Sequence, residues 1–589
     1  MRRKNSTALL FMLVSAALFA SFLFSLPRHF LLPGREIRPT SVIFRNHQSF
    51  KNLHHAIATE DDIRRALHHQ HHHLSSSSIA DDPRIASILL RDWEVLLILS
   101  PDNSLSFDAT GDIYYCLFQN NATFPAKPAG ILPSTNLATF KCLLPSSVRR
   151  NRPIFQPILT KRREFWPVNS SESPELFRWG FLAYESFSTE NDVIIFAKGV
   201  NHRQGVNRSP TELRCVFGDD VSVSNSVVTD VTSSSQEVFR CRHPDETALA
   251  RLSHGGKEKK IKISLQFQLE EEKKVLPSVA YYTPWSKPAE AVVVQEKSLM
   301  CACTMVYNVA KFLKEWVVYH SKLGVEKFFL YDNGSGDGLE QVVSELLLRR
   351  ESYNNVTIEI LWWPWPKTQE AGFSHCALHA RDSCSWMIYI DVDEFIFSPS
   401  WLNSSHPSTN MLRSFLPISS SSSNSSQLGQ IGIRCLEFGP SNQRLNPVRG
   451  VTQGYTCRRR SDQRHKSMVL LDAVDESLVN VIHHFRLKEG YREKLLRVGE
   501  GVVNHYKYQA WPEFKTKFRR RVSAYVADWK KETNPNSKDR TPGLGFLPVK
   551  PKGWANKFCE VNDTRLQQVT QKWFGSESRT GFKMAWQDE

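Results

Sequence analysis

The sequence predicts an α/β domain with a Rossmann-like, mainly parallel sheet, preceded by an all-β accessory domain and by an N-terminal transmembrane helix. Three patterns carry this prediction. β-like runs alternate with amphipathic helical stretches after residue 296, short β-like runs separated by turns fill about 90–285, and a long stretch near the N-terminus has no charge. Alternation of strands and helices is typical of parallel sheets, and successive short strands are typical of all-β domains.

The N-terminus begins with positive residues, followed by nineteen uncharged residues from Ala8 to Leu26. A helix of that length spans a bilayer, and the preceding positive charge favours a cytosolic N-terminus. We therefore expect a cytosolic tail at 1–7, a signal-anchor at 8–26 and a single-pass type II membrane protein. A cleaved signal peptide is the alternative. Residues 27–85, rich in histidine and serine, predict a polar stem.

The chain has 589 residues and a net charge of +15, with a sequence pI of about 9.2. Its length predicts more than one core. The basic balance suits an acidic partner, but no DNA- or RNA-binding motif is present, so we expect no nucleic acid. Eleven cysteines and several glycosylation sequons favour a secretory lumen, and the odd cysteine count leaves one thiol unpaired. These sequons include those that begin at Asn121, Asn169, Asn207, Asn355, Asn403, Asn424 and Asn562.

The region 86–290, which we assign to the β-rich accessory domain, contains an internal repeat. Cys116 and Cys142 are separated by twenty-six residues, as are Cys215 and Cys241, and similar residues surround each pair. We predict two hairpin-like units, each closed by a disulfide that contributes about 3.5 kcal/mol on the chain-entropy account. This domain either binds glycan or braces the domain that follows it.

Strands and helices of the region 296–589 can be placed in order. A strand at 297–308 is followed by a helix at 309–324, which Gly324 can end. A strand and a polar turn occupy 325–338, a second helix 338–350 and a third strand 356–363. A third helix covers 372–384, and the strand 385–390 leads into the acids of "MIYIDVDEFIF".

Two polar turns follow buried strands in this region. One contains Asp332 and Asn333, and the other contains Asp391 and Asp393. Ligands of parallel sheets bind beyond the carboxyl ends of strands, and side chains two residues apart on extended backbone point the same way. Two carboxylates there suit Mg²⁺ or Mn²⁺ shared with phosphates. A helix cap or a surface turn is the alternative reading of this Asp-x-Asp.

Three stretches together resemble glycosyltransferase family 92, and in particular its plant members, which include β-1,4-galactan synthases. They are "MVYNVAKFLKEWVVYHSKLGVEKFFLYDNGSGD" at 305–337, "WMIYIDVDEFIF" at 386–397 and "VNHYKYQAWPEFKTKFRRR" at 503–521. The resemblance covers roughly 296–530. It implies a GT-A fold for 296–589, a UDP-sugar donor such as UDP-galactose, Mn²⁺ (or Mg²⁺) and inversion at the anomeric carbon. It also implies a Golgi type II protein with a carbohydrate-binding β domain ahead of the catalytic domain.

The resemblance also implies roles for individual residues. Asp391 and Asp393 match the metal-binding DxD motif, with Asp393 as the direct ligand and Asp391 also facing the donor. Asp332 and Asn333 match the turn that meets the uridine. Asn308 begins the first helix of the family pattern, but Val309 follows it where the family has Glu, which puts a carboxylate role there in doubt. Glu315 and His320 match the same helix, with either a functional or a structural role.

Candidates for the remaining roles come from their position in the chain. His505 and His483, or the adjacent His484, can complete the metal site as neutral imidazoles. Lys466 can neutralise the leaving diphosphate.

The acceptor hydroxyl needs a base, for which Glu437 is the first candidate and Asp472 and Asp475 are others. Glu394 can be a structural acid beside the metal pair. The tryptophans of 361–366 can stack on a sugar or pack in the core.

We therefore expect a metal-dependent inverting hexosyltransferase that acts on a polysaccharide or glycan, with pectic galactan as the leading acceptor. The rival readings are a glycoside hydrolase that uses Asp393 and Glu394, and a non-catalytic glycan-binding scaffold. Adjacent residues on a strand face opposite sides, so that hydrolase pair has poor geometry. A homo-oligomer is left open.

Overall fold

The computed structural model describes residues 85–90, 93–100, 113–150, 153–161, 166, 174–201, 206–218, 226–252, 260–269, 272–286, 296–417, 426–481, 483–516, 543–544, 547–548, 550–578 and 581–587. All of them belong to one compact unit, Ala56–Glu589. The predicted tail and anchor, and all but the last residue of the stem, lie outside these residues. No helix among the described residues is both long and apolar enough to cross a membrane.

Two sheets form the β-rich region. The first has seven strands in the order β6-β3-β4-β5-β2-β1-β7, and a second, eight-stranded sheet has the order β14-β13-β10-β11-β12-β9-β8, with β15 paired to β13. The helix α3 spans Glu246–Leu252. The strands are β1 Ile85–Leu89, β2 Glu94–Leu99, β3 Tyr114–Leu117, β4 Thr123–Ile131, β5 Ala138–Leu143, β6 Ile158–Thr160, β7 Phe177–Arg178, β8 Leu182–Ser188, β9 Val193–Lys198, β10 Leu213–Phe217, β11 Val227–Ser235, β12 Val238–Cys241, β13 Ile261–Leu269, β14 Glu272–Val275 and β15 Tyr281–Tyr282.

The two predicted disulfides are present, and each closes a three-stranded meander rather than a hairpin. Cys116 on β3 bonds Cys142 on β5, and Cys215 on β10 bonds Cys241 on β12. In both cases an intervening strand, β4 or β11, pairs with both bonded strands. The repeat in the sequence therefore corresponds to a repeated unit in the fold. The middle strands escaped prediction because prolines interrupt β4 and because β11 ends in a polar run, Thr232–Ser235.

The third sheet belongs to the α/β region and has nine strands. Its first part is parallel, in the order β18-β17-β16-β19, as predicted. Beyond β19 the sheet is mixed, because β23 is antiparallel to both β19 and β21. The strands are β16 Ser298–Val306, β17 Lys327–Asp332, β18 Thr357–Trp362, β19 Cys384–Tyr389, β20 Glu394–Phe397, β21 Gln427–Glu437, β23 Gln463–Leu470, β26 Tyr491–Leu495 and β27 Val502–His505. "Mainly parallel" thus describes only part of the sheet.

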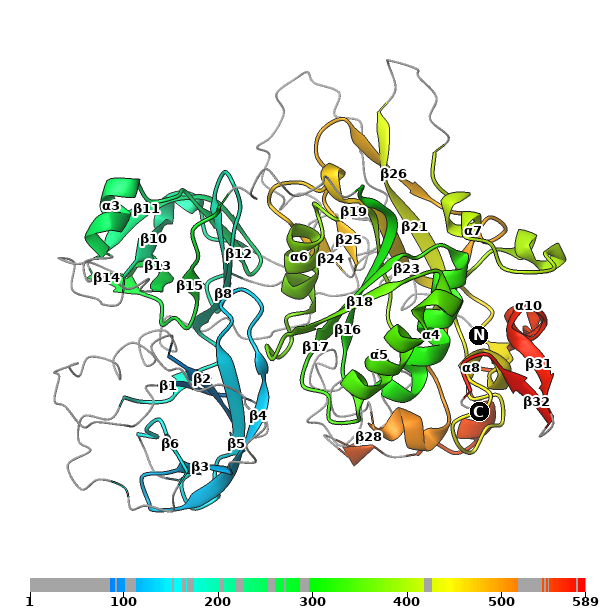
Figure 1. Cartoon of the computed structure of the whole chain (residues 1–589), viewed down its shortest axis with the longest axis horizontal. Coiled ribbons are helices and arrows are strands. Elements are labelled where there is room, and N and C mark those ends of the chain that lie inside the picture. Colours follow the sequence, from blue (N-terminus) through cyan, green and yellow to red (C-terminus); the bar gives the residue numbers. More distant parts are fainter. Residues whose placement is uncertain are drawn as a thin grey trace, which may run out of the picture. The chain divides into compact units, whose positions relative to one another are not determined.

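Helices cover both faces of the parallel strands (Figure 1). The helices α4 (Ala310–Leu323) and α5 (Leu339–Leu348) pack in one hydrophobic cluster, and α6 (Gln369–His379) packs in another on the opposite face. The predicted end of α4 is confirmed, since Gly324 has a φ of +117° and caps the helix. α6 begins three residues earlier and ends five residues earlier than predicted. Shorter helices are α7 Asn410–Arg413, α8 Val451–Gly454 and α10 Arg565–Phe574.

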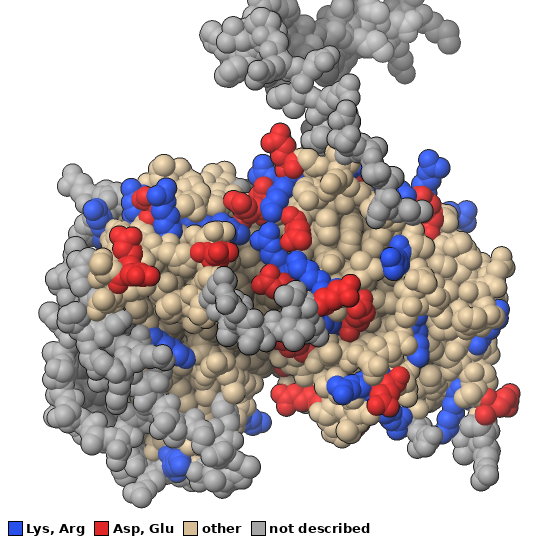
Figure 2. Space-filling model, turned by 45° about the horizontal axis from the view of Figure 1, so that its top comes forward, with Lys and Arg blue, Asp and Glu red and all other residues tan. Residues whose placement is uncertain are grey.

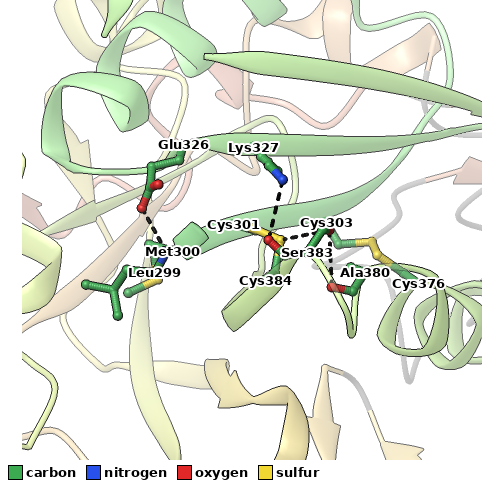
Figure 3. Close-up of a disulfide and its surroundings, with 10 residues drawn as sticks. All are labelled: Leu299, Met300, Cys301, Cys303, Glu326, Lys327, Cys376, Ala380, Ser383 and Cys384. Carbon is green, nitrogen blue, oxygen red and sulfur yellow. Dashed lines mark hydrogen bonds between the residues drawn. A yellow bond between two sulfur atoms is a disulfide. The ribbon is translucent and has the colours of Figure 1, made fainter. Parts of the chain in front are cut away.

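Disulfides tie the parallel strands to their surroundings. Cys301 on β16 bonds Cys384 on β19, and Cys303, two residues along β16, bonds Cys376 on α6 (Figure 3). A further bond joins Cys457 to Cys559. Cys435 is the unpaired thiol that the odd count predicted, and it is buried.

The β-rich region and the α/β region share a continuous core. Trp179 stacks on Trp365 with ring centroids 5.6 Å apart and an interplanar angle of 8°. Tyr184 packs against both Trp363 and Trp365. Trp363 and Trp365 are fully buried, so these two tryptophans of the 361–366 cluster serve packing rather than sugar stacking.

Candidate active site

Polar residues collect where the parallel strands end. Asp332 ends β17 and pairs with Val306, the last residue of β16, while Asp391 follows β19, whose Tyr389 pairs with Cys303 of β16. Because these strands run in the same direction, their carboxyl ends share one edge of the sheet. Asn308, two residues after β16, lies at that edge as well.

The turn after β17 is built by hydrogen bonds between loops. Asp332 Oδ1 accepts from the Ser335 backbone N–H at 2.9 Å, and the Ser335 hydroxyl accepts from the Asn308 N–H at 3.0 Å. Asn308 Oδ1 accepts from the Gly336 N–H at 2.8 Å, and Asn333 donates its amide to the Trp363 carbonyl at 2.6 Å. The φ of +51° at Asn308 suits asparagine, which tolerates left-handed backbone. These side chains therefore form one rigid surface.

Asp391 and Glu394 share the ammonium of Lys466. Lys466 Nζ lies 2.8 Å from Asp391 Oδ2 and 2.9 Å from Glu394 Oε2, and Glu394 Oε2 also accepts from the Asp391 backbone N–H. Burial lowers the pKa of Lys466, but the two carboxylates outweigh it and raise the pKa above its usual value. Burial raises the pKa of Asp391, yet Lys466 holds that pKa well below the ordinary range. Lys466 is thus permanently charged.

Asp393, Glu394 and His505 form a cluster whose ligand atoms lie within 4.8 Å of one another. His505 Nε2 is 3.7 Å from Asp393 Oδ1, and His505 Nδ1 is 3.3 Å from Glu394 Oε1. The pairing of β20 with β27 sets this arrangement, since Glu394 lies directly opposite His505. Burial lowers the pKa of His505 to about 4, so its imidazole is neutral at pH 7.

Glu394 is fully buried and sits at the centre of these contacts. Burial raises its pKa to about 8, against the effect of Lys466, and the charges of Asp391 and Asp393 add to the rise. Within the described part of the chain, its Oε1 is buried without a hydrogen-bond partner. From the sequence, Glu394 is expected to be a structural acid beside the metal pair or, in the hydrolase alternative, the partner of Asp393. The sequence signal that could have marked Glu394 as a member of the site is its position as the third acid after a buried strand.

His483 lies at the same place but contacts Lys466 rather than the cluster. Its Nε2 is 2.6 Å from Lys466 Nζ and accepts a hydrogen bond from the ammonium. Burial, followed by the charge of Lys466, lowers the pKa of His483 well below its usual value. His483 therefore orients Lys466, and its adjacent residue His484 belongs to a different cluster with His465 and Glu493.

Glu437 lies beside His505 at the end of β21, because the two residues are paired in the sheet. Its carboxylate accepts from Lys507, from Arg459 at 3.3 Å and from the Tyr508 hydroxyl at 3.3 Å. Burial raises the pKa of Glu437, but Lys507 outweighs it and the net shift is downward. A carboxylate held in this way is a weak base, so the geometry does not favour the role of general base.

The other sequence candidates lie elsewhere. β23 runs antiparallel to β19, so Asp472, just after β23, is at the amino end of β19, where it forms ion pairs with Arg381 and Lys297. Asp475 accepts from the Ser477 backbone N–H at 3.0 Å in a local turn.

Two residues of α4 serve the framework. Glu315 accepts from the backbone N–H groups of Val451 and Thr452 at 2.7 and 3.0 Å. His320 Nδ1 lies 2.9 Å from the Trp316 carbonyl oxygen, and its Nε2 accepts from Ile396 at 3.4 Å. Both side chains therefore hold backbone of distant elements, which favours the structural reading.

Sequence comparison places the chain among known proteins. A glycosyltransferase family 92 protein of Oryza sativa subsp. japonica is 42% identical over 416 residues, which cover 67% of this chain and 67% of that protein. The chain belongs to glycosyltransferase family 92. Members from Ricinus communis and Arabidopsis thaliana are 41% and 39% identical over 406 and 420 residues, covering 68% and 71% of this chain and 68% and 70% of those proteins.

The glycosyltransferase family 92 model matches residues 296–541, which contain both polar turns and His505. The alignments with the relatives are longer than the whole of 296–589, so the likeness to family 92 members extends into the β-rich region. At least part of the β-rich region is therefore similar to these relatives.

Solved structures are similar only at a distance. A mannosyltransferase from Pyrobaculum calidifontis in complex with GDP-Man and Mn²⁺ has a TM-score of 0.23 at 12% identity, covering 49% of this chain and 77% of that chain. S. aureus TarS in complex with UDP has a TM-score of 0.19 at 11% identity, covering 42% of this chain and 70% of that chain. Such values carry no information about the ligands of the present chain.

Proposed function

We propose that this family 92 glycosyltransferase is a metal-dependent inverting enzyme that moves a hexose from a UDP-sugar onto a polysaccharide or glycan. The leading donor is UDP-galactose, and the leading acceptor is the β-1,4-galactan side chain of pectin. We further propose that the enzyme is a Golgi type II membrane protein with residues 8–26 as its anchor. The observation that carries the enzymatic proposal is the Asp393–Glu394–His505 cluster at the strand edge that also bears Asp332 and Asp391.

The ligand atoms of this cluster suit Mn²⁺ or Mg²⁺. Mn²⁺ binds both carboxylates and neutral imidazole, and Mg²⁺ binds carboxylate oxygens. Asp391 and Glu394 contact the single ammonium of Lys466, while Asp393 lies beside Glu394 and His505. Glu394 Oε1 is buried without a hydrogen-bond partner in the described part of the chain. A cation would remove both the excess negative charge and the unsatisfied atom. Asp393, His505 and Glu394 would hold it, and the bound cation would offset the charge of the diphosphate.

The residues of the chain have separate tasks in this proposal. Asp332 and Asn333 present a rigid turn to the nucleoside, since their loop is fixed to Asn308 and Trp363. Lys466 keeps Asp391 ionised and places a fixed positive charge near the position of the leaving diphosphate. The acceptor oxygen attacks the anomeric carbon on the face opposite UDP. The new glycosidic bond forms as the bond to UDP breaks, and the configuration inverts. UDP leaves with the electron pair of the broken bond, and the hydroxyl proton of the acceptor is released to solvent water.

The net charge of +15 is compatible with an acidic polysaccharide as the acceptor. Figure 2 shows, however, that Lys and Arg side chains are interspersed with Asp and Glu side chains across the middle of the face it draws. The electrostatic potential over that part of the surface therefore does not have a single sign. The choice of pectic galactan rests on the family resemblance rather than on charge.

The test uses the full-length protein with a panel of UDP-sugars and acceptor oligosaccharides, with Mn²⁺ or with EDTA. We expect transfer from UDP-galactose with Mn²⁺, and at least a hundredfold loss in Asp393→Asn. The control is Asp382→Asn, which changes an exposed acid in the turn before β19 and should retain activity. Hydrolysis of oligosaccharides without a UDP-sugar would favour the hydrolase, and UDP binding without turnover would favour the scaffold.

A further inference from the structure

We propose a second metal site, for Zn²⁺, formed by His465, His484 and Glu493. Ligand atoms of the three residues lie within 4.8 Å of one another. They come from three separate strands: β23, β25 (His484–Phe485) and β26. The site is distinct from the Asp393–Glu394–His505 cluster and does not rest on the proposed transferase activity.

The two sites lie on opposite faces of β23. His465 and Lys466 are consecutive on this strand, so their side chains point to opposite sides of the sheet. The register of β23 with β21 agrees with this alternation, since Lys466 pairs with Ile433 and His465 pairs with the next residue, Arg434. Zn²⁺ at His465 would therefore lie behind the sheet, away from the carboxylates that Lys466 contacts.

The hydrogen bonds of His484 leave one ring nitrogen for a cation. Its Nε2 lies 3.2 Å from the His465 carbonyl oxygen, to which only an N–H can donate. In the neutral imidazole, Nδ1 then carries the lone pair, and it lies 3.2 Å from Glu493 Oε1. A lone pair that faces a carboxylate is repulsive unless a cation lies between them. A backbone carbonyl that fixes the other ring nitrogen is also the usual second contact of a metal-bound histidine.

Burial supplies the second observation. His484 is 7% exposed, and its Nδ1 and Glu493 Oε1 are both buried without a hydrogen-bond partner in the described part of the chain. Leaving two such atoms unsatisfied is costly. The separation of 3.2 Å is close to the roughly 3.3–3.5 Å between two ligand atoms of a tetrahedral zinc ion, whose bonds are about 2.0–2.2 Å.

The backbone beside the cluster leaves little space for any other side chain. Gly432 of β21 lies beside the cluster, and a Cβ there would approach Glu493 Oε1 to 3.0 Å and His465 Cδ2 to 3.5 Å. The His465 and His484 rings are already close, with centroids 4.1 Å apart. Two imidazoles and one carboxylate are a common set for zinc, with a water as the fourth ligand.

The test uses full-length protein in the Asp393→Asn background, which weakens the other cluster. The protein is stripped with a chelator, equilibrated with Zn²⁺ and passed through gel filtration, and its zinc is measured by mass spectrometry. We expect Asp393→Asn to hold one zinc per chain more than the double variants with a further His484→Gln or Glu493→Gln change, because all of them share the same histidine-rich segment 27–85. Zinc should also raise the melting temperature of the first protein and not of the double variants.

The matched control is His406→Gln in the same background, because His406 is exposed and lies outside both clusters. This control should keep the same zinc content as Asp393→Asn. If a double variant does not fold, cobalt substitution of Asp393→Asn provides a second measurement, since a four-coordinate site with nitrogen ligands gives strong visible absorption. An equal zinc content in Asp393→Asn and in both double variants would overturn the proposal and leave a His484–Glu493 ion pair.

Discussion

At the scale of single residues, Lys466 determines the charge balance of the candidate active site. It is buried, and its ammonium contacts Asp391, Glu394 and His483. Removing one partner of a buried ion pair leaves an uncompensated charge, which costs far more than an exposed pair contributes. The same change frees two carboxylates to bind a cation.

We therefore expect Lys466→Met to lower the free energy of unfolding by about 3 kcal/mol in the absence of metal. Mn²⁺ should raise the melting temperature of this variant more than that of the wild type, because the cation replaces the lost ammonium. Urea unfolding and thermal melts with and without Mn²⁺ measure both effects. Lys552→Met, at an exposed position, should change neither quantity. An equal effect of Mn²⁺ on wild type and Lys466→Met would contradict this account.

Several members of the site could be predicted from the sequence, and others could not. Asp391 and Asp393 follow a buried strand, so a local pattern was enough to single them out. The contact of His505 with Glu394 depends on the pairing of β20 with β27, strands that lie more than a hundred residues apart. The use of His483 to orient Lys466 likewise depends on tertiary contacts that no local pattern encodes.

At the scale of elements, Glu315 connects α4 to the start of α8. Its carboxylate accepts from the backbone N–H groups of Val451 and Thr452 and from the Thr452 hydroxyl at 2.6 Å. Gly450 has a φ of +103°, and a Cβ at that position would lie 2.5 Å from Glu315 Oε2. Helix, turn and carboxylate therefore fit together without room for a substitution.

The pKa of Glu315 leads to a pH-dependent prediction. Burial raises this pKa to about 7, against its hydrogen bonds, from an ordinary value of 4.5. The folded state then holds a proton that the unfolded state releases, so this group's contribution to stability is full below pH 4.5 and falls as the pH rises through 7. Glu315→Gln turns an amide donor toward a backbone N–H, which costs roughly 1–3 kcal/mol.

We expect Glu315→Gln to be less stable than the wild type, with a difference that is largest near pH 5 and shrinks toward pH 8. Urea unfolding of both proteins at several pH values in this range measures the difference between their free energies of unfolding. Groups that titrate in both proteins contribute equally and cancel in this difference. Glu340→Gln, in the first turn of α5 and exposed, is the control and should show a constant difference. A difference that grows with pH would show that Glu315 is ionised in the folded protein.

Prediction from sequence worked best where elements that are consecutive in the chain also pack side by side in the fold. Helix α4 and its Gly324 cap were clear from periodicity, and β16 to β19 form the predicted parallel part. The rest of the sheet escaped prediction because β21, β23, β26 and β27 are ordered in space differently from their order in the chain. No periodicity distinguishes parallel from antiparallel pairing in short, buried strands.

At the scale of the whole molecule, the β-rich region and the α/β region are joined by a large apolar core and by polar contacts. Trp179 donates its indole N–H to the Pro366 carbonyl at 3.2 Å and stacks on Trp365. Gln236 donates to the Asn480 carbonyl at 2.8 Å. Asn480 lies on β24 (Asn480–Val481), which pairs with β25 in a hairpin whose turn contains His483. The accessory domain therefore contacts the hairpin that carries His483, the residue that hydrogen-bonds Lys466. Bracing of this kind is one of the two roles proposed for the domain.

This coupling predicts that the two regions unfold together. Calorimetry of the wild type should show one unfolding transition. Trp179→Ala should lower the free energy of unfolding by about 3–5 kcal/mol, the usual cost of truncating a buried tryptophan. Because the lost contacts join the regions, the variant should also split the transition into two. Trp285→Ala removes a partly exposed tryptophan of the β-rich region and should keep a single transition. Two separate transitions in the wild type would mean that the shared core does not couple the regions, and the accessory domain would then have glycan binding as its remaining role.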